Sequence, residues 1–438
     1  MKYYKKKKRC IAIFLIIFLF GMPIPHSSAL VCSSLFSWFS RDGTHENSIP
    51  KVGPKDITII GAGAFGTTIA SILALEGNNV EIWGRDENTI HEINQSHTNP
   101  KLVDESKAKI PLPETLKGVL DLEKAVDRAE IIFLAVTSKG EVEVAKQLAT
   151  IPSIRNEEKI IVSLDKGFVY GAKDTAKEHP RLSLDILSEI LRKPREDLVY
   201  IAGPDLAKEI MQGVSTVIVI ASGNPQNAAT VRKVFGKKVN IEETKDFTGV
   251  EVYAAAKNSY AILYGILEIS RQYNHKIGIN TLAQFFSKAL VEMTVLAKKL
   301  SSGHSYKSTA LGPAGIGDLY VTCMGGRNAL FGITATRDFY KTGKSFRESM
   351  KATQDTLEGI EAARAIHVLA AQKGISLPIN ETLYRILYED ASLEDEIPTL
   401  LRLFGKQYPN GSHFGSWWDK VGILSRKAHD FFVKKEGR

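Results

Sequence analysis

The sequence predicts a doubly wound α/β domain with a mainly parallel sheet, followed by an all-α domain. Between residues 56 and 245, short apolar runs alternate with helical stretches, the order that builds a parallel sheet with helices on both faces. After residue 246 the apolar residues recur at helical spacing, and strand-like runs no longer appear. The chain has 438 residues, of which 44% are hydrophobic, and is long enough for two domains with separate cores.

Six apolar runs of four to six residues are the predicted strands. They are continuous and rich in Val and Ile, as expected of parallel strands that are buried on both faces. The runs are Ile57–Ile60, Val80–Trp83, Ile131–Val136, Ile160–Leu164, Val199–Ala202 and Val217–Ala221. Helical stretches such as 67–75 and 141–148 lie between some of them, and we expect order to begin at Asp56.

Long amphipathic or apolar runs predict the helices of the second half. These runs are Phe247–Ile269, Ile279–Leu300, Leu357–Gln372 and Thr382–Tyr388. We therefore divide the chain into a basic and hydrophobic extension with a linker at 1–55, the α/β domain at 56–245, the helical domain at 246–404 and a polar tail at 405–438.

The basic residues are concentrated at the N-terminus. The net charge is +8, but residues 1–50 hold seven basic and two acidic residues, which leaves +3 for the other 388. This small surplus does not indicate nucleic-acid binding, and it suits an anionic small substrate. The three cysteines, Cys10, Cys32 and Cys323, form no evenly spaced disulfide framework, and we expect no metal site.

The loop Gly61–Gly66, with the sequence GAGAFG, lies between a predicted strand and a predicted helix. In such a loop the first Gly permits the tight turn, the second lets the backbone approach a pyrophosphate, and the third lets strand and helix pack closely. The helix N-terminus then offers unpaired N–H groups to the phosphates. The alternative is a Gly-rich turn without a ligand, but the strand before and the helix after favour a Rossmann domain that binds a dinucleotide.

The end of the second predicted strand leaves the choice between NAD and NADP open. Arg85 and Asp86 follow this strand after Gly84. A carboxylate at the strand end binds the ribose 2′-hydroxyl of NAD, whereas an Arg can accept the 2′-phosphate of NADP. Both residue types are present, and the position of Arg85 favours a cofactor contact over a solvated loop charge.

The N-terminal extension has the parts of a signal peptide. Lys5–Arg9 is basic, Cys10–Ile24 is apolar, and small residues follow at 27–29. Three alternatives stand: an export signal, a membrane anchor formed by residues 10–24, or a start codon assigned too early, with Met22 as the true start. A membrane span needs about 20 residues, more than this run offers. Because a soluble dinucleotide cofactor is available in the cytosol, we expect a cytoplasmic protein.

Three lysine-bearing or acidic segments are candidates for the substrate side. Lys166 closes a predicted buried strand, Lys257 interrupts an otherwise apolar helix, and Asp318 lies in the run Gly315–Leu319. An ammonium buried without a partner is costly, so a lysine on an apolar helix face is a candidate functional group. A single such lysine more often extends its ammonium to the surface.

Together these segments resemble the NAD(P)-dependent glycerol-3-phosphate dehydrogenase family, from about residue 56 to residue 401. The motifs that carry the resemblance are GAGAFG at 61–66, Lys166-Gly167, Gly203-Pro204 with Ala207 and Glu209, Val250-Glu251, Lys257-Asn258, Gly278–Asn280, Glu292-Met293, Gly315–Leu319, Thr322-Cys323, Arg327-Asn328 with Gly332, and Glu358-Gly359. So many ordered motifs are far more specific than any one of them.

The resemblance implies interconversion of dihydroxyacetone phosphate and sn-glycerol 3-phosphate with NAD or NADP, in glycerophospholipid and carbohydrate metabolism. It implies a small phosphorylated substrate and a homodimer. Lys257 is the expected general acid, with Asp318 and Lys166 beside it, and Arg327 and Asn328 would hold the phosphate. The expected substrate residues are Lys166, Gly203, Asp205, Lys257, Asp318, Gly326, Arg327 and Asn328. The expected cofactor residues are Gly61, Gly63, Ala64, Phe65, Gly66, Arg85, Lys166, Ala207, Arg327 and Glu358.

The sequence departs from the family pattern at several positions. Asp205 and Gly326 stand where the family usually has serines, and Thr137 stands where it usually has proline. Two hydroxyls expected at the substrate are therefore absent, and an Asp there would repel a phosphate unless it points away. These departures motivate two alternatives: a related hydroxyacid-type dehydrogenase with a different substrate, or a cofactor-binding paralogue with impaired catalysis.

Overall fold

The computed structural model describes residues 53–104, 106–156, 158–170, 179–303, 306–353 and 357–405. All of the described residues belong to one compact unit within Val52–Arg438. The predictions for the segment 10–24, for most of the linker and for the tail after residue 405 lie outside the described residues. None of the described helices has the length and apolar content that crossing a bilayer requires.

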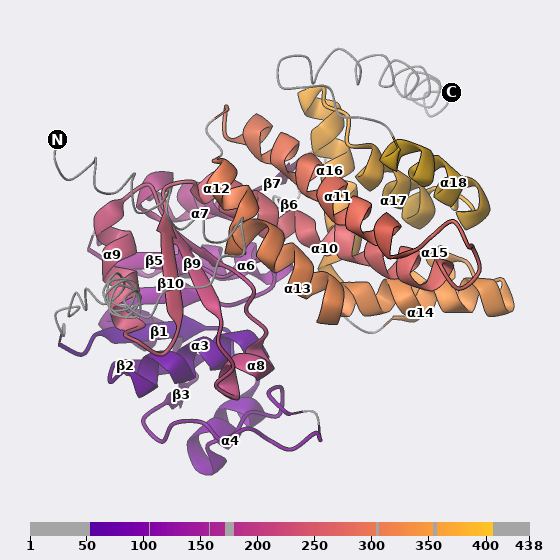
Figure 1. Cartoon of the computed structure of the whole chain (residues 1–438). Helices are drawn as coiled ribbons and strands as arrows, with labels where there is room; N and C mark the ends of the chain where they lie inside the picture. The colour runs from indigo at the N-terminus through magenta and orange to yellow at the C-terminus, as the bar shows by residue number, and fades with distance from the viewer. Residues whose placement is uncertain are drawn as a thin grey trace, which may run out of the picture. The chain divides into compact units, whose positions relative to one another are not determined.

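The N-terminal half of this unit is built on an eight-stranded sheet in the order β10-β9-β8-β5-β4-β1-β2-β3 (Figure 1). All six predicted strands are present. They are β1 (Asp56–Ile60), β2 (Asn79–Trp83), β4 (Ile131–Leu134), β5 (Ile160–Ser163), β8 (Val199–Ala202) and β9 (Val217–Ala221). Strand β1 pairs in parallel with both β2 and β4, so the direction of winding reverses between β1 and β4. Ligands bind in the crevice at the carboxyl ends of strands at such a point.

Side chains alternate between two cores, one on each face of the sheet. In β4, Ile131 and Phe133 join one core, and Ile132 and Leu134 join the other. The first core includes residues of helices α3 (Ala64–Leu75), α4 (Glu87–Ser96) and α9 (Pro225–Val234), and the second includes residues of α5 (Leu122–Arg128), α6 (Ser138–Thr150) and α7 (Ser183–Leu191). The predicted doubly wound domain is confirmed.

Some strands were not predicted from the sequence. The edge strands β3 (Lys117–Val119) and β10 (Asn240–Thr244) are short or polar, and neither forms an apolar run. A two-stranded sheet joins β6 (Val169–Tyr170) to β7 (Pro180–Arg181). Strand β8 runs antiparallel to β9, while the other pairs in the large sheet are parallel. No run of apolar residues could have shown this change of direction.

The second half is helical in the described residues, as predicted. Its elements are α10 (Phe247–Ser270), α11 (Ile279–Leu300), α12 (Lys307–Leu311), the π-helical turn η4 (Pro313–Gly317), α13 (Asp318–Gly325), α14 (Arg327–Thr342), α15 (Phe346–Ala352), α16 (Glu358–Lys373), α17 (Pro378–Tyr388) and α18 (Leu393–Phe404). Helix α11 has the predicted bounds, whereas α17 begins at Pro378, four residues before the predicted start.

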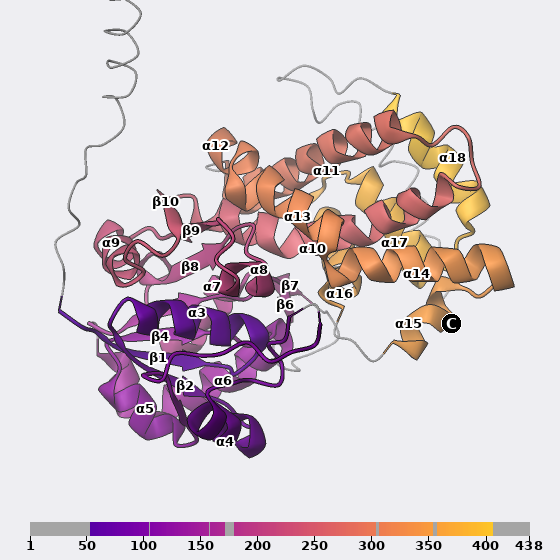
Figure 2. The ribbon, with the colours of Figure 1, turned by 60° about the horizontal axis from the view of Figure 1, so that its bottom comes forward.

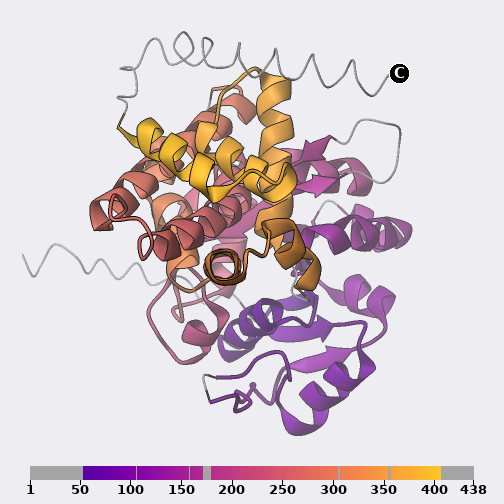
Figure 3. The same ribbon diagram turned by 90° about the vertical axis from the view of Figure 1, so that its right-hand side faces the viewer.

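Helix α10 is the centre of this half and packs against α11, α13, α14 and α16 (Figure 2). The C-terminal helices α16, α17 and α18 pack in succession (Figure 3). Gly265 and Gly332 let α10 and α14 approach closely, because a Cβ on Gly332 would lie 2.1 Å from the carbonyl oxygen of Ile262. The first turns of α10, including Val250 and Ala254, also join one core of the sheet. This helix therefore places Lys257 where both halves meet.

Candidate active site

The Gly61–Gly66 loop joins β1 to α3 and has the geometry of an anion site. Gly61 has φ +123°, and a Cβ there would lie 2.3 Å from the carbonyl oxygen of Ala135, so this position needs glycine. A Cβ on Gly66 would lie 2.1 Å from the carbonyl oxygen of Gly61. Helix α3 begins at Ala64 and receives no side-chain cap from Gly63. Its first N–H groups are thus available to a phosphate.

Phe65 links this loop to the substrate side. The ammonium of Lys166, which follows β5, lies 4.9 Å from the centroid of the Phe65 ring, within range of a cation–π interaction. Ala207 begins the short helix α8 (Ala207–Met211), and its carbonyl oxygen accepts a hydrogen bond from Thr68 of α3 at 3.4 Å. Three of the predicted cofactor residues therefore come from separate segments to one edge of the sheet.

Two buried ion pairs hold the predicted catalytic lysines. Lys257 of α10 pairs with Asp318 at the start of α13, and both side chains are at most 4% exposed. Lys166 pairs with Asp205, whose side chain is 3% exposed. Asp318 directly follows the π-helical turn η4. Such turns are rare and frequently occur at functional sites.

The two lysines have opposite pKa shifts. Burial lowers the pKa of Lys257, Lys166 lowers it as well, and the attraction of Asp318 and Asp205 does not fully compensate. Burial also lowers the pKa of Lys166, but Asp205, Asp318 and Glu358 outweigh it, and the net shift is upward. Lys257 is therefore the better proton donor of the two, while Lys166 is a permanent cation.

A hydrogen-bond network around Asn258 fixes the spacing of four segments. Asn258 donates to the backbone oxygen of Lys166 at 3.0 Å and to Glu358 at 3.3 Å. Asn328 donates to Asn258 at 3.0 Å and accepts from the N–H of Gly359 at 2.9 Å. The network ties the end of β5 to α10, α14 and α16. Sequence analysis assigned Asn328 to the phosphate and gave Asn258 no role of its own.

Arg327 and Gly326 form the start of α14. Arg327 is exposed at its first turn, and its charge partly offsets the burial that raises the pKa of Glu358. A Cβ on Gly326 would lie 2.4 Å from the carbonyl oxygen of Thr322, so the tight connection between α13 and α14 excludes a serine without a shift of the backbone. The missing hydroxyl at this position thus has a steric cause.

Gly203 occupies another constrained turn, between β8 and α8. It has φ +141°, and a Cβ there would lie 2.5 Å from the carbonyl oxygen of Val217. This close approach to β9 accounts for glycine at the position.

Arg85 and Asp86 have different surroundings. Asp86 caps the N-terminus of α4, where it accepts hydrogen bonds from the N–H of Asn88 and from the hydroxyl of Thr89. The bond from Thr89 is the main cause of its lowered pKa. Arg85 is exposed, and its only described ion pair is a 3.9 Å contact with the exposed Glu143. The carboxylate is therefore engaged, and the guanidinium is available.

Two buried carboxylates near Lys166 were not predicted. Asp165 accepts a hydrogen bond from Ser138 at 2.6 Å, and burial raises its pKa well above the ordinary value. Glu141 accepts from Ser163 and Ser183 at 2.9 and 2.8 Å, and burial raises its pKa to about 7. Sequence analysis predicted 141–148 only as a helical stretch and had no means of detecting that Glu141 is buried.

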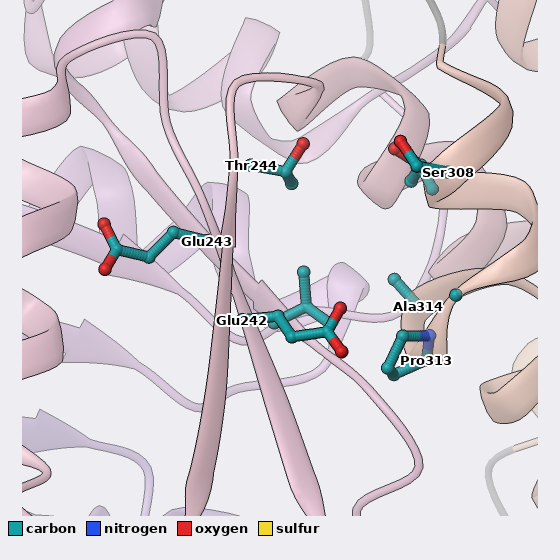
Figure 4. Close-up of a pocket in the computed structure, with 9 residues that line it drawn as sticks. Glu242, Glu243, Thr244, Ser308, Pro313 and Ala314 are labelled. Carbon is teal, nitrogen blue, oxygen red and sulfur yellow. The ribbon is translucent and has the colours of Figure 1, made fainter. Parts of the chain in front are cut away.

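A separate cleft lies between β10 and the segment around η4 (Figure 4). Its lining includes Glu242, Glu243, Thr244, Ser308 and Pro313. None of the predicted site residues lines this cleft, so it is distinct from the lysine-centred site.

Comparison with known proteins agrees with this arrangement. Residues 56–228 match the model of the NAD-dependent glycerol-3-phosphate dehydrogenase N-terminus, and residues 246–398 match that of the C-terminus. A protein of Lactobacillus johnsonii named glycerol-3-phosphate dehydrogenase [NAD(P)+] is 34% identical over 79% of this chain and 96% of its own length. The chain belongs to the NAD-dependent glycerol-3-phosphate dehydrogenase family. The resemblance predicted from the motifs is confirmed.

Other members of the family cover the same part of the chain. A relative from Treponema pallidum with the same name is 32% identical over 79% of this chain and 99% of its own length. The crystal structure of glycerol-3-phosphate dehydrogenase from Coxiella burnetii has a TM-score of 0.66 and 26% identity, and the match covers 81% of this chain and 99% of that one. Family membership thus rests on both halves of the chain, and the two alternative functions are not favoured.

Proposed function

We propose that the chain is a glycerol-3-phosphate dehydrogenase that transfers hydride between NAD(P)H and dihydroxyacetone phosphate. The observation that carries this proposal is the buried Lys257–Asp318 pair beside Lys166, which itself contacts Phe65 of the Gly loop. A proton donor, a permanent cation and a dinucleotide loop thereby meet at one edge of the sheet. The bound dinucleotide supplies the hydride at the nicotinamide C4.

Lys257 provides the proton in this proposal. Reduction of the ketone forms an alkoxide at C2 of the substrate, and the ammonium of Lys257 donates a proton to that oxygen and stabilises its developing charge. In the reverse direction the neutral amine accepts the proton. The downward pKa shift caused by burial makes the ammonium a stronger acid. Asp318 fixes the position of the ammonium through the ion pair.

The start of α14 provides the phosphate site. Arg327 presents a planar guanidinium that matches phosphate oxygens, and the helix N-terminus adds unpaired N–H groups. Asn328 is buried, and its amide and carbonyl already bind Asn258 and Gly359. We infer that Asn328 holds this turn in place and has few hydrogen-bonding groups left for the substrate.

The Gly loop fits a dinucleotide on the evidence of its own geometry. Nothing lies within 4 Å of a Cβ built on Gly63, so the space beside this residue is open. Gly61, Ala64 and Gly66 would complete the pyrophosphate site. Glu358, tied to Asn258, would lie toward the nicotinamide half together with Lys166.

A steady-state assay tests the proposed function. The wild-type chain is expected to oxidise NADH or NADPH with dihydroxyacetone phosphate, and to act poorly on unphosphorylated dihydroxyacetone, because the phosphate site contributes binding energy. Turnover of another ketone in preference would indicate a changed substrate. Nicotinamide binding without turnover of any ketone would indicate an impaired paralogue, and either result contradicts the proposal.

Replacement of Arg85 by Ala is expected to discriminate between the two cofactors. Because Asp86 is engaged in capping α4 and Arg85 is exposed, we infer that Arg85 receives the 2′-phosphate of NADP. The KM for NADPH should rise by about tenfold, equivalent to about 1.4 kcal/mol, and the KM for NADH should change less than about twofold. Equal changes for both cofactors would contradict this role.

The proposal also covers the domain boundaries and the oligomeric state. We propose a cofactor domain at 56–245 and a substrate domain at 246–404, since α10 follows β10 directly. Exposed apolar side chains on neighbouring helices, such as Tyr320 at 57% and Leu330 at 61%, support a homodimer. Analytical ultracentrifugation checks this assembly.

A cytoplasmic location follows from the need for soluble nicotinamide, and mass spectrometry of the native N-terminus tests whether residues 10–24 are retained.

A further inference from the structure

Asp205 is a buried carboxylate with one oxygen left without a partner. Its Oδ1 pairs with Lys166, and its Oδ2 is buried with no hydrogen-bond donor in the described part of the chain. The turn that carries it is rigid, because Gly203 is pressed against β9 and Thr216 donates a hydrogen bond to the carbonyl oxygen of Pro204. The carboxylate therefore cannot easily leave the site.

The charges around Asp205 cancel within the site. Three charged groups interact with it: Lys166 from the end of β5, Lys257 from α10 and Asp318 from the start of α13. Two lysines and two aspartates sum to zero when all are ionised. A phosphate monoester carries about −1.5 to −2 charges at pH 7. In this state the substrate meets no surplus of positive charge from the four groups, and the Asp205 carboxylate repels it.

We propose, on the basis of the proposed function, that Asp205 couples binding of the phosphorylated substrate to the uptake of one proton. The proton comes from solvent and binds the Asp205 carboxylate. The neutral acid no longer pairs with Lys166, and the ammonium of Lys166 is then free to attract the substrate. Asp205 thereby sets the pH range over which this site accepts a phosphorylated substrate.

The protonation energetics support this mechanism. Burial raises the pKa of Asp205 to about 6, although Lys166 opposes the shift. The free enzyme is thus mostly ionised at this position at pH 8. The negative charge of the substrate favours the neutral acid further, so binding takes up a proton. When only the neutral form is competent, the apparent affinity falls in proportion to its population, about tenfold for each pH unit above the pKa.

Calorimetric titration of sn-glycerol 3-phosphate into the full-length enzyme with NADH bound tests the proposal without turnover. Titrations at pH 8 in two buffers of different ionisation enthalpy count the protons taken up. The wild type is expected to take up close to one proton, and Asp205→Asn close to none. Asp205→Asn should also bind about a hundredfold more tightly than the wild type at pH 8, because this pH lies about two units above the pKa of Asp205. Because the second pKa of the phosphate is about 6, the ligand itself contributes little between pH 7 and 8.

Two further variants complete the test. Asp205→Ser removes the charge with a smaller side chain and should behave like Asp205→Asn. Glu242→Gln removes an exposed carboxylate on β10 of the same sheet and should behave like the wild type. Unchanged NADH affinity shows that each variant is folded.

The proposal is overturned if the wild type takes up no proton, if Asp205→Asn and the wild type take up the same number, or if the loss of the carboxylate weakens binding. Failure of the proposed function would instead appear as a wild type that binds the ligand but does not turn over dihydroxyacetone phosphate.

Discussion

Replacement of Lys257 by Met is expected to lower kcat with dihydroxyacetone phosphate by at least about a hundredfold, the low end of the contribution of a general acid. Met has a similar length and fills the space in α10 without an ammonium. The lost cation no longer donates to the alkoxide or stabilises its charge. Steady-state kinetics with saturating cofactor measures the effect, and turnover within about tenfold of the wild type would contradict the assignment.

The same replacement leaves Asp318 buried and unpaired, so stability needs its own control. Removing one partner of a buried ion pair typically costs about 3–5 kcal/mol of folding free energy. The double variant Lys257→Met with Asp318→Asn removes both charges, and it should recover most of the stability but none of the activity. Urea unfolding at the assay pH measures the first effect. Recovery of activity in the double variant would show that Lys257 acts through folding alone.

The sequence was sufficient to predict the strands and helices whose own residues form an apolar pattern. The buried strands β1 and β4 and the helix α11 were predicted to within two residues, because side chains alone determine their burial. The edge strand β10 was missed because most of its residues are exposed and polar. Its strand conformation depends on pairing with β9, a contact that a single segment does not encode.

In the candidate site, too, some residues could be identified from the sequence, whereas their contacts could not. Lys257 was identifiable from sequence because an ammonium on an apolar helix is unusual, and the Gly loop because its spacing has a steric reason. The pairing of Lys166 with Asp205 was not, since the two residues lie 39 positions apart. Asn258 was overlooked as an organising residue because its partners come from three distant segments. Side-chain identity thus predicted candidate groups that the fold brings together, and only the fold showed which partners hold them.

Substitutions at the glycines of the Gly61–Gly66 loop are expected to have a second large effect, on cofactor affinity. Replacement of Gly63 by Asp is expected to leave the fold intact and to weaken NADH binding by about a hundredfold or more. Gly63 has φ −81° and ψ 175°, which any residue adopts, and no atom lies within 4 Å of a Cβ built there. The added carboxylate would instead occupy the space next to the N-terminus of α3, where the pyrophosphate is expected. Two like charges about 4 Å apart repel by roughly 4 kcal/mol near a protein surface, before screening by salt.

Fluorescence titration with NADH measures the affinity, and thermal unfolding without cofactor measures the fold. Gly63→Ala is the matched control, because it adds only a methyl group and should weaken binding far less than Asp. Gly66→Ala should behave in the opposite way, since its Cβ would lie 2.1 Å from the carbonyl oxygen of Gly61 and the unfolding temperature should fall even without cofactor. If Gly63→Asp binds NADH like the wild type, the pyrophosphate does not lie at this loop. If it unfolds as Gly66→Ala does, the space beside Gly63 is needed for the fold and carries no information about a cofactor.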